Sequence, residues 1–155
     1  MKNRVLTVSM LFSIFSFPSL ATFAAEQTGT ANVEIVSALS ITEETEVDFG
    51  QVVNVDGTCS MASGGVLSGV AGMGCTGTET PGVIRVDGTV NAYVDASVSA
   101  GPPVDGVSFT PRIDGKTTRI LSKGDAHFPV IGDIILNGAT DGEKDIPYIF
   151  TANYQ

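Results

Sequence analysis

The amino-acid sequence predicts an all-β protein that folds as a sandwich of about seven or eight strands. Apolar side chains recur on every second position in several segments, most clearly in residues 89–99 and 146–154. This is the period of a strand with one buried face. Five Asp-Gly pairs, a preferred sequence for tight hairpin turns, separate such segments. Because no stretch keeps a 3.6-residue period, we expect no long helix.

The start of the chain predicts a secretory signal peptide at residues 1–24. Lys2 and Arg4 precede an apolar run over residues 5–17, and small residues follow. We expect cleavage after Ala24, with cleavage after Ala21 as the alternative. The apolar run is too short for a durable membrane span. Residues 25–155 then form a single exported β-sandwich domain without a membrane span.

The charge balance excludes several partners. Of eight basic residues, two lie in the expected signal peptide, so six basic residues face seventeen acidic ones, a net charge of −11. A chain this acidic is repelled by nucleic acid and by anionic membrane surfaces. We therefore expect neither nucleic acid nor a membrane surface as a partner.

Two cysteines in an exported chain are expected to pair. Cys59 and Cys75 enclose a segment with five glycines, which we expect to be an open loop. A crosslink of this span stabilises the fold by about 3 kcal/mol through loop-closure entropy. The spacing matches neither a redox CxxC motif nor a zinc-binding pattern. The sequence therefore predicts a structural disulfide.

The segment after the signal peptide starts polar and then alternates. Residues 25–42 are long for one strand, so a break is expected near Ser37. The following segment, VDFGQVV, should place Val47 and Phe49 on one face, with Gly50 free to bend the chain. The alternating apolar positions of the first segment are Ala31, Val33, Ile35, Leu39 and Ile41.

Further strands are expected between the Asp-Gly turns. The clearest one, residues 89–99, places five apolar side chains on one face. The final one enters through Asp141-Gly142 and places apolar side chains on alternate positions. The expected strands are residues 82–86, 89–99, 107–113, 117–121, 128–136 and 146–154, and the apolar positions of the final strand are Ile146, Tyr148, Phe150, Ala152 and Tyr154.

No motif predicts catalysis, a cofactor or a metal. Residues 72–77 fit GxGxxG, but that motif needs a strand before it and a helix after it, and here it lies in the cysteine loop. His127 is the only histidine, which excludes histidine-rich metal sites, and we expect it at the surface or an edge. No acidic cluster matches a calcium-binding loop. We expect no enzyme, although two carboxylates that converge in space remain an open alternative.

Five segments together carry a family resemblance. The alternating first segment, VDFGQV, IRVDGTVNAYV, VIGDIILNGATDG and YIFTANYQ resemble a family of secreted bacterial proteins, the domain of unknown function 4402. That family is pilin-like. The resemblance implies a place in a fimbrial operon.

The chain also resembles subunits assembled by the chaperone–usher route in Gram-negative bacteria. Tyr154 is next to last and Gly142 is fourteenth from the end, as in those subunits. The resemblance implies an incomplete immunoglobulin-like domain that a neighbour's N-terminal strand completes. It also implies a periplasmic chaperone, an outer-membrane usher, and passage through the periplasm to a fimbrium on the cell surface. The local cysteine pair and the short apolar segment depart from the common fimbrial pattern.

Two functions follow as expectations. In the first, the chain is a fibre subunit for cell adhesion. Residues 25–36 are then a donor-strand extension, in which Ala31, Val33 and Ile35 of residues 28–36 donate a strand, and residues 146–154, with Gly142, border the accepting groove. In the second, the chain is a self-contained secreted or periplasmic β-sandwich that binds an unknown ligand. The two differ in whether Ala31, Val33 and Ile35 pack on their own domain or on a neighbour.

Overall fold

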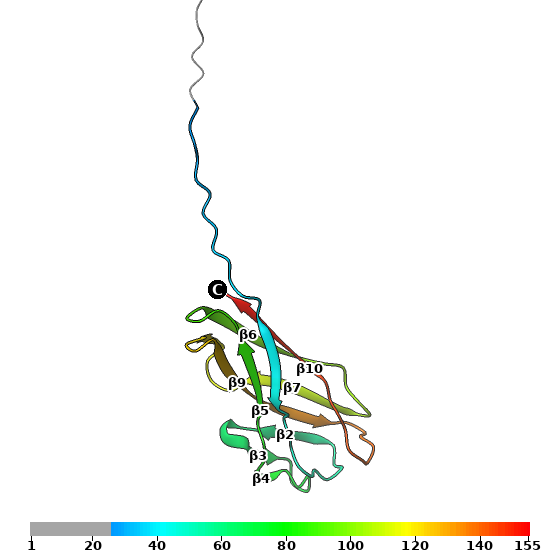
Figure 1. The fold of residues 1–155 in the computed structure, drawn as a ribbon. Coiled ribbons are helices and arrows are strands. Elements are labelled where there is room, and N and C mark those ends of the chain that lie inside the picture. Colours follow the sequence, from blue (N-terminus) through cyan, green and yellow to red (C-terminus); the bar gives the residue numbers. More distant parts are fainter. Residues whose placement is uncertain (1–25) are drawn as a thin grey trace, which may run out of the picture. The chain divides into compact units, whose positions relative to one another are not determined.

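A computed structural model describes residues 26–155, so the expected signal peptide at residues 1–24 lies outside the described residues. By its contacts the chain divides into two units, Met1–Val33 and Glu34–Gln155. The second unit is the all-β fold that the sequence predicts, with two antiparallel sheets (Figure 1). Among the described residues there is no α-helix, only the 3-10 turn η1 (Ser63–Gly65).

The larger sheet contains seven strands, and the longest of them, β9 (Asp125–Leu136), lies at its centre. The first half of β9 pairs with β5 (Gly82–Asp87), and its second half pairs with both β2 (Gly57–Met61) and β7 (Val107–Ile113). Because β2 and β7 share residues 133–136 of β9, they lie on its opposite sides. The sheet is completed by β1 (Ser40–Thr45) beside β5, and by β3 (Val66–Gly69) and β4 (Thr76–Thr78) beyond β2.

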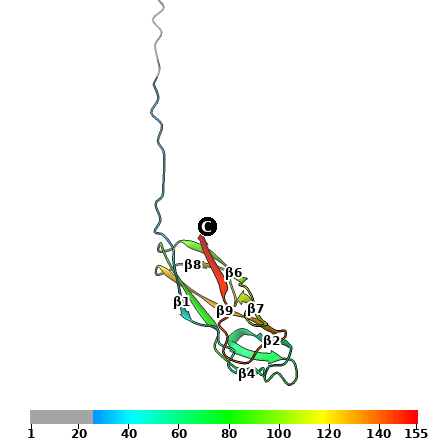
Figure 2. The ribbon, with the colours of Figure 1, turned by 90° about the vertical axis from the view of Figure 1, so that its right-hand side faces the viewer.

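The smaller sheet contains three strands in the order β10, β6, β8. β10 (Tyr148–Tyr154), the red strand in Figure 2, pairs with β6 (Tyr93–Ala100) along its whole length. β8 (Thr118–Ile120) pairs with the start of β6. β10 alternates between half-buried and exposed residues, which is the predicted period of two.

Two apolar clusters form the core. One gathers around Phe109 and includes Met61 and Ile134. The other gathers around Phe128, whose side chain is fully buried, and includes Val94. Both clusters also contact half-buried side chains from β10 and from the segment after β1, so the core continues toward those two elements.

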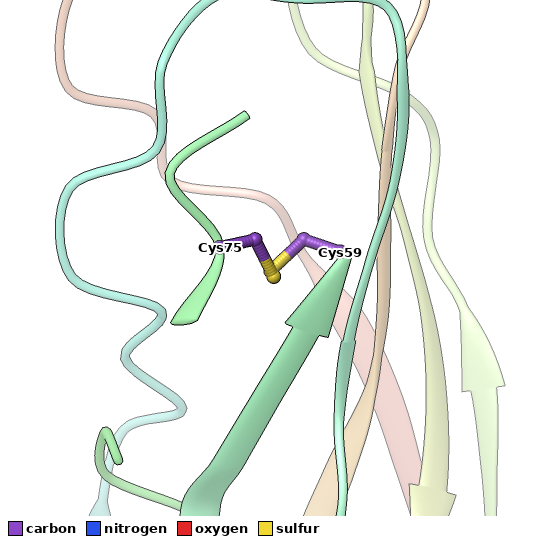
Figure 3. The surroundings of a disulfide bond; sticks show 2 residues. All are labelled: Cys59 and Cys75. Carbon is purple, nitrogen blue, oxygen red and sulfur yellow. A yellow bond between two sulfur atoms is a disulfide. The ribbon is translucent and has the colours of Figure 1, made fainter. Parts of the chain in front are cut away.

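The disulfide is confirmed, but the expected open loop around it is wrong. Cys59 in β2 and Cys75 just before β4 point toward each other with their Cα atoms 5.7 Å apart (Figure 3). The segment between them forms β3, and β2, β3 and β4 pair in turn as a meander. Gly69 of β3 makes this possible, because a Cβ atom there would lie 2.7 Å from the Cβ atom of Cys75. This meander raises the number of strands within residues 26–155 to ten.

The first strand is shorter than predicted. Of the expected segment, residues 25–42, the structure describes residues 26–42; those from Ser40 onward belong to strand β1, and residues 26–39 pair with no strand. Val47 and Phe49 share one half-buried face as expected, and Gly50 bends the chain with a φ of +62°.

The strand expected at residues 89–99 also begins later than predicted. Residues 89–92 form a turn in which Asn91 has a φ of +64°, so Val90 is exposed and β6 starts at Tyr93. Of the five Asp-Gly pairs, only Asp105-Gly106 has positive φ at both residues. Asp56-Gly57 and Asp87-Gly88 lie at strand ends, since β2 begins at Gly57 and β5 ends at Asp87, whereas Asp114-Gly115 and Asp141-Gly142 lie in connections longer than two residues.

Candidate functional site: a groove between two edge strands

Each sheet ends in a strand that has a neighbour on one side only. β1 is the end strand of the larger sheet and pairs only with β5, whereas β10 is the end strand of the smaller sheet and pairs only with β6. Within residues 26–155, no strand pairs with the outer edge of either. Such edges present a row of backbone N–H and C=O groups that can pair with another strand.

A groove of about 1640 Å³ lies between the segments that carry these two edges. This is larger than a typical small-molecule site of roughly 300–1,000 Å³. One wall is β1 and the residues after it, the other is the connection from β9 into β10, and side chains of β7 and β9 lie between them. Its apolar lining residues are Ile41, Val47, Phe49, Val52, Ile84, Val107, Phe109, Ile134, Leu136, Ala139, Ile146, Pro147, Tyr148 and Phe150.

Three aromatic rings cross the groove from wall to wall. The ring centroids of Phe49 and Phe109 are 5.9 Å apart, and those of Phe109 and Tyr148 are 5.7 Å apart. Both pairs meet edge to face, the arrangement that the charge distribution of aromatic rings favours. A rigid apolar surface therefore lies at the point where the two walls approach each other.

Tyr148 also links the two walls by a hydrogen bond. Its hydroxyl donates to Oε1 of Glu43 in β1 at 2.7 Å. Burial, followed by the hydrogen bond and the charge of Glu43, raises the pKa of Tyr148 well above its ordinary value. The phenol therefore stays protonated at physiological pH and keeps its role as donor.

The structure brings part of the predicted groove strand to the groove. Ile146, Tyr148 and Phe150 line it, whereas Ala152 and Tyr154 lie outside its lining and pack on the Phe128 cluster. Between Tyr148 and Phe150, the side chain of Ile149 lies on the other face of the strand and is 57% exposed.

Gly142 lines the groove from the connection before β10 rather than from the strand itself. Its φ is +116°, and the nearest atom to an added Cβ would be Nζ of Lys144 at 3.9 Å. Backbone conformation, not close packing, is thus what calls for glycine at this position.

Tyr154 has a separate role. Its hydroxyl accepts a hydrogen bond from the backbone N–H of Thr89 at 2.7 Å and donates one to the carbonyl oxygen of Ser37 at 2.8 Å. The Ser37 N–H donates to Oγ1 of Thr89 at 2.8 Å. These bonds fix the point from which the chain runs back toward Ile35.

The predicted donor residues are exposed. Val33 and Ile35 leave 82% and 89% of their surface accessible, and Ala31 is exposed as well. None of the three lies in a strand. Ile35, which belongs to the same unit as the groove, therefore gains no burial from that unit.

Acidic side chains surround the groove. Lys144 is the basic residue among its lining, and its Nζ lies 3.3 Å from a carboxylate oxygen of Asp105. The seven acidic lining residues are Glu43, Glu44, Glu46, Asp48, Asp141, Glu143 and Asp145. The groove thus combines an apolar interior with a negative rim.

The remaining sequence features fall elsewhere. Residues 72–77, which fit GxGxxG, include the start of β4 and precede no helix. His127 is an exposed residue of β9, with Nε2 3.1 Å from a carboxylate oxygen of Glu44. Within residues 26–155 there is no group of three potential metal ligands and no helix long and apolar enough to cross a membrane.

Comparison with models of known protein families, with curated proteins and with solved structures finds no match. The geometry of the groove is therefore the basis for the function proposed below.

Of the residues that line the groove, Gly142, Ile146, Tyr148 and Phe150 were named as candidate groove residues from the sequence, and the others were not. The edge of β1, Glu43 and the ring of Phe109 were not predicted as parts of a site. The alternation of Val47 and Phe49 was a usable signal, because it marked a second apolar face next to an acidic cluster. Phe109 carried no such signal, because the sequence pattern of a strand does not distinguish an apolar side chain that lines a groove from one that is buried in the core.

Proposed function

We propose that this chain is a pilin-like structural subunit of a bacterial surface fibre, and that residues 28–36 of one copy add a strand in the groove of the next. One observation carries the proposal. An apolar groove between two strands whose outer edges have no partner occurs in the same chain as an alternating segment whose Ile35 is 89% exposed. Adding the segment as a strand to a sheet edge would pair the backbone groups of that edge and bury the exposed side chains of the segment at the same time.

The donor segment is long enough to run along the groove wall. Residues 28–36 span nine positions, an extended length of about 30 Å, whereas the groove-lining side chains Ile146, Tyr148 and Phe150 span five. Ala31, Val33 and Ile35 follow each other at intervals of two. Their spacing matches that of the groove-lining side chains of the facing wall, which also recur at every second residue.

The energetics support assembly. Burying a Val or Ile side chain that was exposed contributes about 1.5–3 kcal/mol. Val33 and Ile35 would supply two such side chains, and the backbone edges would add strand hydrogen bonds worth about 0.5–1.5 kcal/mol each. The half-buried rings of Tyr148 and Phe150 would lose water contact at the same time.

The route to the cell surface is part of the proposal. The Cys59–Cys75 disulfide is typical of proteins that fold outside the cytoplasm. The family resemblance adds a periplasmic chaperone that shields the groove before assembly and an outer-membrane usher. The alternative, a self-contained binding domain, needs residues 28–36 to pair within their own chain, and in the described chain they form no strand.

Complementation in solution tests the proposal. A chain that lacks residues 26–36 is mixed with a synthetic peptide of sequence EQTGTANVEIV, and thermal stability and NMR shifts of the Phe49 and Tyr148 rings are followed. We expect the peptide to raise the melting temperature and to shift both rings. A matched peptide with Ala in place of Val33 and Ile35 should have a much smaller effect.

The full chain provides the second readout. Fibres joined by donated strands should run as a ladder in SDS without boiling and as a monomer after boiling, and deletion of residues 26–36 should abolish the ladder. A monomer in both lanes for the full chain, together with no response to the peptide, would rule out strand donation. A deleted chain that cannot fold would assign the segment to its own domain.

A further inference from the structure

The smaller sheet has an outer face that points away from the core. In β6 and β10 every second side chain packs on the Phe128 cluster, so the residues between them form the opposite, outer face. In β6 these residues are Tyr93, Asp95, Ser97 and Ser99, and all four are exposed. Among the outer-face residues of the described strands β6, β8 and β10, the charged side chain is Asp95. The face is therefore almost neutral on a chain whose net charge is strongly negative.

The strand register places Tyr93 and Asp95 next to each other on this face. They are two positions apart in β6, so both side chains stand on the same side of the sheet. Tyr93 pairs with Ile120 of β8 on one side, and on the other its carbonyl oxygen accepts the backbone N–H of Gln155 at 3.1 Å. Asp95 pairs with Thr118 of β8. An aromatic side chain and a carboxylate are thus neighbours at one end of an open sheet face.

Hydrogen bonds hold the carboxylate of Asp95 in one orientation. The hydroxyl of Thr118 donates to Oδ1, and Nε2 of Gln155 donates to Oδ2 at 2.6 Å. These bonds, that of Thr118 first, lower the pKa of Asp95, so the carboxylate stays ionised. A carboxylate offers about four acceptor positions, so these bonds leave others open to a ligand. The face therefore presents an oriented, charged acceptor next to Tyr93, which is 55% exposed.

These groups match the chemistry of a neutral sugar ring. The face of an aromatic ring is negative and attracts the positively polarised C–H groups on the flat side of a pyranose. The sugar hydroxyls can donate to the carboxylate, and a hydrogen bond to an ionised acceptor is stronger than one between neutral groups. An acidic sugar is disfavoured, because its carboxylate would be repelled by that of Asp95.

A cationic ligand has a better place elsewhere on the molecule. The rim of the groove holds seven carboxylates and one lysine, whereas the outer face of the smaller sheet holds one carboxylate. Charge attraction therefore draws a basic peptide to the groove rim. The outer face is left to ligands without charge.

We propose that the outer face around Tyr93 and Asp95 is a binding site for neutral saccharides. One pyranose ring stacks on Tyr93 and donates hydroxyl hydrogen bonds to Asp95. The site is open and flat, so binding at each copy is weak, and in a fibre the repeated copies would bind one polysaccharide together. The site does not require strand donation, because its residues belong to one folded unit.

An NMR titration of the full chain tests the site. The probes are cellotriose and maltotriose, two neutral trisaccharides of glucose; cellotriose oxidised to carboxylates at C6 is the acidic match, and trilysine is the basic peptide. We expect at least one neutral trisaccharide to shift the ring of Tyr93 and the amide signals of residues 93–97 and 118–120, with a dissociation constant of about 1 mM. The acidic trisaccharide should have a much weaker effect, and trilysine should shift signals of the groove rim instead.

Substitutions locate the binding. Tyr93→Ala should weaken it about tenfold, because the stacking surface is lost, whereas Tyr93→Phe should retain it. Asp95→Asn should weaken it about fivefold, because the acceptor loses its charge. Two control variants should leave binding unchanged: Ile149→Ala alters an exposed residue at the far end of the same face, and Asp133→Asn removes a carboxylate from the larger sheet.

No shift of the Tyr93 ring with either neutral trisaccharide would overturn the proposal. So would equal shifts with the acidic trisaccharide, stronger shifts of this ring with trilysine, or a loss in Ile149→Ala as large as that in Tyr93→Ala. Shifts of the same signals that grow with protein concentration in the absence of sugar would assign the face to contact between copies of the chain instead.

Discussion

Replacing Ile35 by Ala tests the contribution of the donor strand to the fibre contact separately from the stability of the folded monomer. Ile35 is 89% exposed in its own unit, so the change should alter the free energy of unfolding of the monomer by less than about 0.5 kcal/mol. In a fibre contact the same side chain would fill the groove, where truncation of a buried Ile to Ala costs about 2–4 kcal/mol. That loss weakens each contact by about 30- to 1,000-fold.

The measurement combines a denaturation curve of the monomer with the SDS ladder of unboiled fibres. Ile149→Ala is the matched control, because it makes the same chemical change at a side chain that is 57% exposed and points away from the groove. We expect the ladder to vanish for Ile35→Ala and to persist for Ile149→Ala, with similar monomer stability for both. An intact ladder for Ile35→Ala, or a monomer destabilised by more than about 1 kcal/mol, would refute the reasoning.

Three further predictions concern the folded domain. Because the pKa of Tyr148 is raised in the fold, its protonated form stabilises the protein below the ordinary tyrosine pKa of about 10, and this stabilisation is lost as the pH rises above that value; Tyr148→Phe should flatten the alkaline part of a stability–pH curve. Replacing Cys59 and Cys75 by Ser should lower the free energy of unfolding by about 3 kcal/mol in urea denaturation. Gly132→Ala should destabilise the fold by about 1–3 kcal/mol, because the added Cβ would lie 2.3 Å from a backbone oxygen of β7 and 2.6 Å from the ring of Phe109.

The glycine substitution has a control variant, and the other two predictions each have a result that would contradict them. Gly29→Ala adds a methyl group where nothing lies within 4 Å, and it should leave stability unchanged. An alkaline curve for Tyr148→Phe as steep as that of the unaltered chain would assign the pH dependence to other groups. A serine double variant as stable as the oxidised protein would mean that the crosslink adds nothing to the fold.

The sequence predicted the class of fold because alternation acts locally. In β10 the alternating apolar positions Tyr148, Phe150, Ala152 and Tyr154 share the predicted face, since a strand with one buried face needs that pattern whatever its neighbours are. The β2–β4 meander was missed for the opposite reason. Glycine at position 69 usually indicates a loop, and here it is required inside a strand by the approach of Cys75.

The candidate site was less accessible to sequence reasoning. One wall could be predicted from the spacing of Ile146, Tyr148 and Phe150. The other wall depends on β1 being the end strand of its sheet, with no partner at its outer edge. This is a property of the order of the strands, which the pattern of a single segment does not reveal. The hydrogen bond from Tyr148 to Glu43 joins residues 105 positions apart and is equally invisible in the sequence.

The crosslinked meander has a consequence for how the domain opens. β4 pairs only with β3, and β3 is joined to the rest of the sheet through β2 alone. Cys59 and Cys75 fasten both ends of this unit across Gly69, so the oxidised meander can open only together with β2. After reduction, β3 and β4 should detach as a separate cooperative unit, and their amides should exchange with solvent deuterium well before those of β5, β9 and β6.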